Sequence, residues 1–153
     1  MITEKAPGKL YIAGEYAVVE NGYPAILVAL DQFVTCTIEE SVQEVGQIIS
    51  RQYNNDQLSW RRLGDQMVVD KRDNPFSYIL SAIRVTEEYA RTFSRDLRIF
   101  NIHIDSQLDS ANGRKYGLGS SAAVTVATVK ALCRFYNLPV NKDQIFKLAA
   151  IAH

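Results

Sequence analysis

The sequence has little cysteine, no net charge and no long hydrophobic run. Cys36 and Cys133 are too few for a disulfide framework and lack metal-site spacing, so we expect both to be reduced packing residues. Lys and Arg total 17, as do Asp and Glu. This balance lacks the basic surplus of nucleic-acid-binding proteins and disfavours an RNA-binding domain. No apolar run approaches the ~18 residues of a membrane span.

An apolar signal core is also missing from the N-terminus, so we expect a cytoplasmic protein without a membrane partner. What remains is a composition of 47% hydrophobic and 22% charged residues, which is typical of a globular protein. A length of 153 residues suits about one domain.

The first half of the chain alternates between apolar and polar residues, or is rich in β-branched residues, as strands are. We predict strands over residues 9–14, 25–28, 33–38, 46–51, 58–61 and 66–69. Asn21-Gly22 predicts a tight turn between residues 17–19 and 25–28, because these residue types adopt positive φ angles readily. The opening half is therefore expected to be mostly β.

Helical periodicity dominates the second half. Asn74-Pro75 opens a helix with an apolar stripe, a strand is expected over residues 99–105, and a long helix over 121–136. Asn141 is expected to cap a last helix. Because no C-cap or stop signal precedes His153, we expect the chain to be cut inside this helix.

The most informative stretch is KYGLGSSAA, residues 115–123. Gly117 and Gly119 allow the backbone to approach a ligand closely. Ser120 and Ser121 follow at a helix start, where free N–H groups and the helix dipole favour an anion. The stretch therefore predicts a phosphate-binding loop, and a plain helix N-terminus after a loop is the simpler alternative.

Two common nucleotide motifs do not fit this stretch. The Walker pattern G-x-x-x-x-G-K-[ST] is absent. Gly117-x-Gly119-x-x-Ala122 formally matches the dinucleotide fingerprint, with Asp143 at a suitable distance. However, polar residues 110–115 stand where that fingerprint needs a hydrophobic strand, and Asp143 follows a helix break instead of a second strand. The dinucleotide interpretation is therefore rejected.

A segment far upstream adds a second motif. Residues 6–19 read APGKLYIAGEYAVV, and together with KYGLGSSAA they resemble the first two signature motifs of the GHMP kinases. The resemblance covers essentially the whole chain and is greatest for the phosphomevalonate kinase branch. Gly113 departs from the general pattern, which has proline there, and this mildly favours the same branch.

The resemblance implies an α+β fold with a mixed or antiparallel sheet and helices packed on one face. It implies Mg²⁺- and ATP-dependent phosphorylation of 5-phosphomevalonate to 5-diphosphomevalonate, with residues 1–153 forming the N-terminal ATP-binding domain. Mevalonate kinase, another GHMP kinase or an inactive nucleotide-binding fragment are the alternatives. The family's catalytic aspartate, its third glycine-rich motif and its C-terminal lobe are expected outside this chain, so we expect the isolated fragment to be inactive.

The same resemblance assigns roles to individual residues. Those that would bind the ATP phosphates are Lys115, Gly117, Leu118, Gly119, Ser120, Ser121 and Ala122. Ser121 would also ligate Mg²⁺, and Lys9 would place a positive charge near the acceptor and the transferred phosphoryl group. Glu15 and Tyr16 would contact the acceptor. Candidate cations for the acceptor's phosphate are Lys5, Arg114 and Lys115, and residues 74–78 would border the adenine.

Overall fold

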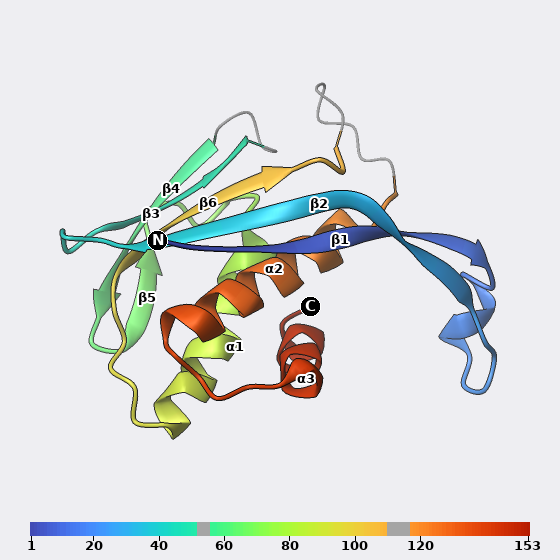
Figure 1. Cartoon of the computed structure of the whole chain (residues 1–153). Coiled ribbons are helices and arrows are strands. Elements are labelled where there is room, and N and C mark those ends of the chain that lie inside the picture. Colours follow the sequence, from blue (N-terminus) through green and yellow to red (C-terminus); the bar gives the residue numbers. More distant parts are fainter. Residues whose placement is uncertain (52–55, 110–116) are drawn as a thin grey trace.

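One mixed sheet organises the part of the chain that the structure, a computed structural model, describes: residues 1–51, 56–109 and 117–153. Within these residues six strands pair in the order β1-β2-β6-β3-β4-β5 (Figure 1). Their bounds are β1 Ile2–Ala13, β2 Ile26–Glu40, β3 Gly46–Ser50, β4 Asp56–Leu63, β5 Gln66–Val69 and β6 Phe100–Ser106. All neighbouring pairs are antiparallel except β3 with β6, which is parallel.

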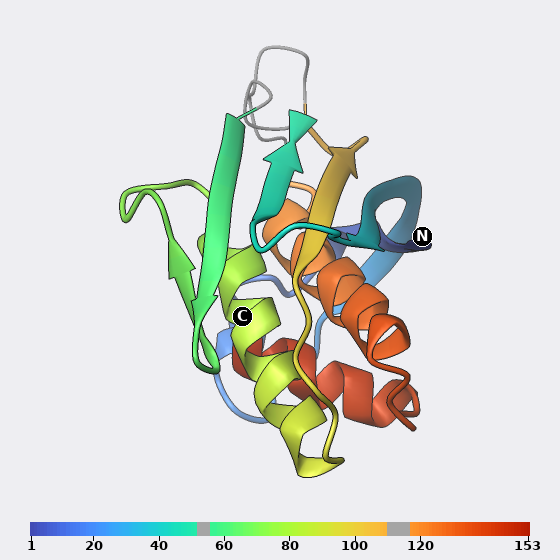
Figure 2. The same ribbon diagram turned by 90° about the vertical axis from the view of Figure 1, so that its left-hand side faces the viewer.

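Helices cover one face of this sheet (Figures 1 and 2). The described residues form α1 (Ser77–Thr92), α2 (Ser120–Phe135) and α3 (Lys142–Ala152). α2 is central, because it contacts β1, β2, α1 and α3. Its side chains are accordingly buried around most of its circumference. The predicted α+β fold, with a mixed sheet and helices on one face, is confirmed.

The long hairpin of β1 and β2 differs from the sequence prediction. Residues 26–28 and 33–38 belong to a single strand, β2, and β1 begins well before residue 9. Ala17–Val19 forms a short 3₁₀ helix, η1. The strands separate at Ala13 and Ile26.

Gly14 explains why the hairpin connection is longer than the tight turn predicted at Asn21-Gly22. Gly14 has a φ of 83°, and its carbonyl accepts a hydrogen bond of 3.0 Å from the N–H of Val18. The chain therefore leaves the sheet before it reaches Asn21-Gly22, although Gly22 still turns the backbone with a φ of 91°. Figure 1 shows this end of the hairpin projecting beyond the helical layer as an arm.

The predicted helix cap at Asn141 and the predicted packing cysteines are confirmed. Asn141 caps α3 through a capping box, in which its side chain accepts from the N–H of Gln144 and its own N–H donates back. Cys36 and Cys133 are buried free thiols, and burial raises the pKa of Cys36 to about 12 and that of Cys133 to about 11. Among the helices of the described segments, none is long and apolar enough to cross a membrane.

A buried polar cluster joins β4, α1 and the end of α2. The guanidinium of Arg62 donates to both carboxylate oxygens of Glu87, with one contact of 3.1 Å, and to the carbonyl of Arg98 at 2.7 Å. The Tyr136 hydroxyl donates to the same Glu87 carboxylate. Burial, followed by the negative charge of Glu87, raises the pKa of Tyr136 well above its usual value.

This cluster predicts a large stability loss when its acid is removed. Glu87→Leu leaves the buried Arg62 guanidinium without its counter-charge, so we expect it to lower the free energy of unfolding by about 3–5 kcal/mol. Glu87→Gln removes the same charge but keeps the shape and one acceptor oxygen, so it should cost less. Urea unfolding followed by circular dichroism measures both variants. Equal stability of Glu87→Leu and the wild type would contradict the prediction.

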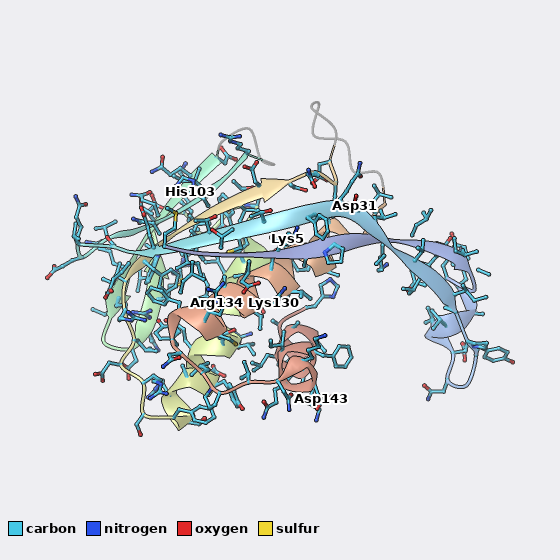
Figure 3. The ribbon with its side chains drawn as sticks, in the orientation of Figure 1. Lys5, Asp31, His103, Lys130, Arg134 and Asp143 are labelled. Carbon is cyan, nitrogen blue, oxygen red and sulfur yellow. The ribbon has the colours of Figure 1, made fainter. Side chains whose placement is uncertain are left out.

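A second charged cluster fastens β1 to α2. Glu4 of β1 lies 2.9 Å from Arg134 and 3.3 Å from Lys130, and Lys130 also donates to the carbonyl of Lys5 at 2.8 Å. Figure 3 shows both basic residues on α2, close to β1. Burial alone would raise the pKa of the Glu4 carboxyl. The hydrogen bonds and charges of Arg134 and Lys130 outweigh it and hold this pKa below its ordinary value.

The lowered pKa of Glu4 predicts an acid-sensitive contribution to stability. A carboxyl whose pKa is lower in the folded state stabilises the fold above its unfolded-state pKa and loses that effect as the pH falls through the folded-state pKa. We expect Glu4→Gln to cost about 0.5–1 kcal/mol at pH 7 and close to nothing at pH 2. Urea unfolding at both pH values measures this difference.

Asp143→Asn is the matched control for this measurement. Asp143 pairs with Lys147 at 2.8 Å, but both side chains are about two-thirds exposed. Since exposed pairs contribute little, this substitution should leave stability nearly unchanged at pH 7. A Glu4→Gln effect that stays constant with pH would contradict the prediction.

Candidate functional site

The glycine-rich segment leads directly into α2. Gly117 and Gly119 have φ angles of 71° and 76°, in the left-handed region that favours glycine. The N–H of Ala123 makes a helical hydrogen bond of 3.0 Å to the carbonyl of Gly119. The N–H groups of residues 120–122 lie before this bond and have no acceptor within the helix. They therefore offer donors, at the positive end of the helix dipole, to an anion.

β1 lies directly against this segment. The N–H of Lys9 donates to the carbonyl of Leu118 at 2.9 Å, at the place where the pairing of β1 with β2 shifts register. A Cβ atom on Gly8 would lie only 2.8 Å from that carbonyl oxygen and 2.5 Å from the side chain of Leu108. The close approach therefore requires glycine at position 8. The two motifs, far apart in the sequence, meet here through their backbones.

The side chain of Lys9 runs along the glycine loop. Its Cγ lies 3.0 Å from where a Cβ of Gly119 would be, so the missing side chain of Gly119 makes room for the lysine stem. Its Nζ lies 4.3 Å from the centroid of the Tyr11 ring, within cation–π range. The structure thus places a half-buried positive charge beside the predicted phosphate loop.

Tyr11 connects Lys9 with the two residues predicted to contact the acceptor. Tyr11, Glu15 and Tyr16 line one hollow of about 330 Å³ on the arm. Glu15 and Tyr16 are exposed and follow the end of β1, beyond the turn at Gly14. Tyr11 was not predicted from the sequence as a site residue. It lies two residues after Lys9 and therefore on the same side of the predicted strand, and this was the signal that could have identified it.

Ser121 has a partner that no motif predicted. Its Oγ lies 3.3 Å from Nε2 of His153, at the end of α3. The ring of His153 stacks on that of Tyr78 in the first turn of α1, with centroids 5.2 Å apart. Residues 74–78, predicted to border the adenine, therefore do approach the start of α2 through Tyr78.

Some predicted residues lie elsewhere. Lys5 is exposed, and its Nζ lies 4.1 Å from the Phe33 ring centroid. Because the neighbouring Ala6 faces the buried side, Lys5 points to the other face of the sheet, and the structure does not bring it to the loop. Arg114 and Lys115 lie outside the described residues. Asp143 is at the opposite end of α3 from His153 (Figure 3), in agreement with the rejection of the dinucleotide interpretation.

The described residues hold no ready-made metal centre. In residues 1–51, 56–109 and 117–153, no group of three or more His, Cys, Asp and Glu side chains could hold a metal ion. Magnesium is usually bound by few protein ligands together with substrate phosphates. The hydroxyl of Ser121 beside the free N–H groups fits an ion that arrives with a nucleotide, and does not fit a resident one.

Comparison with known proteins identifies the family. The model of the GHMP kinases N terminal domain matches residues 77–153, which is half of the chain. The chain belongs to the GHMP kinases. The resemblance seen in the two motifs is therefore confirmed, and the glycine segment before α2 lies inside the region that the family model matches.

Individual relatives agree with this assignment. Phosphomevalonate kinase of Streptomyces sp. (strain CL190) is 36% identical over 99% of this chain and 42% of its own length. Mevalonate kinase of Methanocaldococcus jannaschii is 37% identical over 97% of this chain and 45% of its own length. Streptococcus pneumoniae phosphomevalonate kinase, in complex with phosphomevalonate and AMPPNP, matches with a TM-score of 0.80 and 32% identity over 99% of this chain and 42% of that one. This GHMP kinase chain thus spans less than half the length of these relatives.

The close approach of β1 to the glycine loop leaves no room for a side chain at Gly8, and this predicts the effect of adding one. Gly8→Ala should weaken the hydrogen bond between Lys9 and Leu118 and lower the free energy of unfolding by about 1–3 kcal/mol, as overpacking does. Amide hydrogen exchange should show reduced protection of the Lys9 N–H.

Gly64→Asn is the control for this substitution. Gly64 has a φ of 64°, which Asn tolerates, and no heavy atom lies within 4 Å of where its Cβ would be. Unchanged protection of the Lys9 amide in Gly8→Ala would refute the role given to this glycine.

Proposed function

We propose that this chain is the ATP-binding part of a cytoplasmic kinase of the mevalonate pathway, which phosphorylates 5-phosphomevalonate to 5-diphosphomevalonate. The observation that carries the proposal is the backbone contact between Lys9 and Leu118, which joins the two family motifs at the start of α2. Two relatives named phosphomevalonate kinase, one of them a complex with phosphomevalonate and AMPPNP, support this acceptor.

The phosphates of ATP are assigned to the glycine segment. Gly117, Leu118 and Gly119 would surround them with backbone, and the N–H groups of residues 120–122 would donate to them. Lys115 would add a cation from the start of the same motif. A magnesium ion bound with the nucleotide would neutralise phosphate charge, and the Ser121 hydroxyl would be its protein ligand.

Lys9 is assigned to the reaction itself. Catalysis of phosphoryl transfer depends mainly on positioning and on stabilising charge, and less on covalent chemistry. The Lys9 stem runs past Gly119 and its ammonium lies over the Tyr11 ring, so the charge is beside the loop before substrate arrives. A fixed cation there would stabilise the charge that develops on the transferred group.

The acceptor is assigned to the side of the arm. Glu15 and Tyr16 share a hollow with Tyr11, which in turn contacts Lys9. An acceptor lying between this hollow and the loop would have its reacting end near the Lys9 ammonium. The resemblance implies that the family's catalytic aspartate would come from a further segment.

Mevalonate kinase is the second candidate, because the archaeal mevalonate kinase is as similar to this chain as the bacterial phosphomevalonate kinase is. The two activities differ by one phosphate on the acceptor. A nucleotide-binding fragment without turnover is the third candidate.

An acceptor panel separates the three candidates. ADP release is measured with MgATP and either phosphomevalonate, mevalonate or homoserine, on this chain and on the full-length protein that contains it. Turnover of the full-length protein on phosphomevalonate alone would support the proposal, and turnover on mevalonate alone would replace it by the second candidate. Nucleotide binding without turnover on any acceptor would favour the third.

Lys9 provides the mutational test. In the active full-length kinase we expect Lys9→Met to lower kcat by about 10²–10³-fold, as the loss of one transition-state contact does, with a smaller change in KM for ATP. Lys147→Met is the control, because Lys147 is exposed on α3 and pairs only with Asp143 among the contacts described. A kcat of Lys9→Met within threefold of the wild type would exclude the assigned role.

A further inference from the structure

His153 reaches the start of α2 from the end of a different helix. Its Nε2 lies 3.3 Å from Oγ of Ser121, whose side chain is half-buried in the first turn of α2. α3 runs from Lys142 to Ala152 and ends next to α2 (Figure 1). The imidazole therefore contacts a hydroxyl in the first turn of α2, where the N–H groups of residues 120–122 have no acceptor within the helix.

The ring of His153 is held in place by a second contact. It stacks on Tyr78 with an interplanar angle of 17° and a centroid separation of 5.2 Å. A parallel stack occupies a face of the imidazole and leaves its edge, which carries Nε2, free for a hydrogen bond in the ring plane. Tyr78 belongs to the first turn of α1, so all three helices meet at this point.

The contact constrains the hydroxyl of Ser121. A serine hydroxyl has one hydrogen to donate and two lone pairs to offer. If its hydrogen points to Nε2 of His153, the lone pairs are directed away from the ring and are available to a cation. Such an outer partner commonly fixes the orientation of a metal ligand.

We propose that His153 is a positioning residue of the phosphate site, which accepts the Ser121 hydroxyl hydrogen at Nε2 and so presents the Ser121 oxygen to the magnesium ion of MgATP. The inference rests on the proposed function of the glycine loop, and it adds to that function a residue from α3. Tyr78 supports it by holding the ring.

A purely structural role is the competing explanation, because the same ring helps α3 pack on α1. Two substitutions separate the roles. His153→Phe retains a flat ring that can stack on Tyr78, but it has no hydrogen-bond acceptor. His153→Gln loses the aromatic stack, but its side-chain amide can reach the position of Nε2 and accept the hydroxyl hydrogen.

The experiment measures nucleotide binding to the full-length protein by calorimetry, with ATP in the presence of Mg²⁺ and with ATP in EDTA. We expect His153→Phe to weaken MgATP binding by about tenfold, the lower end for loss of a metal ligand's outer partner. Binding of ATP in EDTA and the melting temperature should change little. His153→Gln should bind MgATP within threefold of the wild type.

A double-mutant cycle with Ser121→Ala sharpens the test. If His153 acts through the Ser121 hydroxyl, His153→Phe should have no further effect on MgATP binding once that hydroxyl is gone. Asp143→Asn is the control on α3, because it changes an exposed side chain at the opposite helix end.

Three outcomes would overturn the inference. They are wild-type affinity of His153→Phe for MgATP, equal losses in His153→Phe and His153→Gln, and an additive effect of His153→Phe on Ser121→Ala. Failure of the wild type itself to bind MgATP would instead refute the proposed function, and the inference would fall with it. Binding of Mn²⁺ in the presence of ATP, followed by electron paramagnetic resonance, gives a second readout of the metal.

Discussion

The hydrogen bond between the N–H of Lys9 and the carbonyl of Leu118 is the contact on which the site depends. It forms only because β1 and the glycine loop approach each other at backbone distance, which excludes a side chain at Gly8 and leaves little room for one at Gly119. The register shift of β1 against β2 occurs at the same place. A strand irregularity, two glycines and a helix start thus combine into one local structure that carries both family motifs.

α2 and β1 are joined at two places, and this makes the local structure rigid. The Lys9–Leu118 bond lies at the N-terminal end of α2, while Glu4 binds Lys130 and Arg134 further along the same helix. The buried circumference of α2 fixes it between the sheet and the other helices. Because the helix cannot slide against β1, the free N–H groups at its start keep their position relative to the Lys9 ammonium.

The other two helices contribute to the site indirectly. The buried Arg62–Glu87–Tyr136 cluster anchors α1 to β4 and to the end of α2. With α1 fixed, Tyr78 in its first turn meets His153 from α3 beside Ser121. A side chain that belongs to no motif, His153, therefore contacts the motif serine, and Tyr78 supports it from α1.

Sequence patterns alone determined the element types, the cap at Asn141 and the two family motifs, because these depend on residues close together in the chain. The phase of β1 placed Lys9 and Tyr11 on one side of the strand, but their neighbour Gly119 could not be deduced from spacing. The contacts of Lys9 with Leu118 and of His153 with Ser121 were decided only by the tertiary structure. The physical reason is that strand pairing and helix packing bring together residues that are far apart in the sequence. No periodic pattern in the sequence connects such residues.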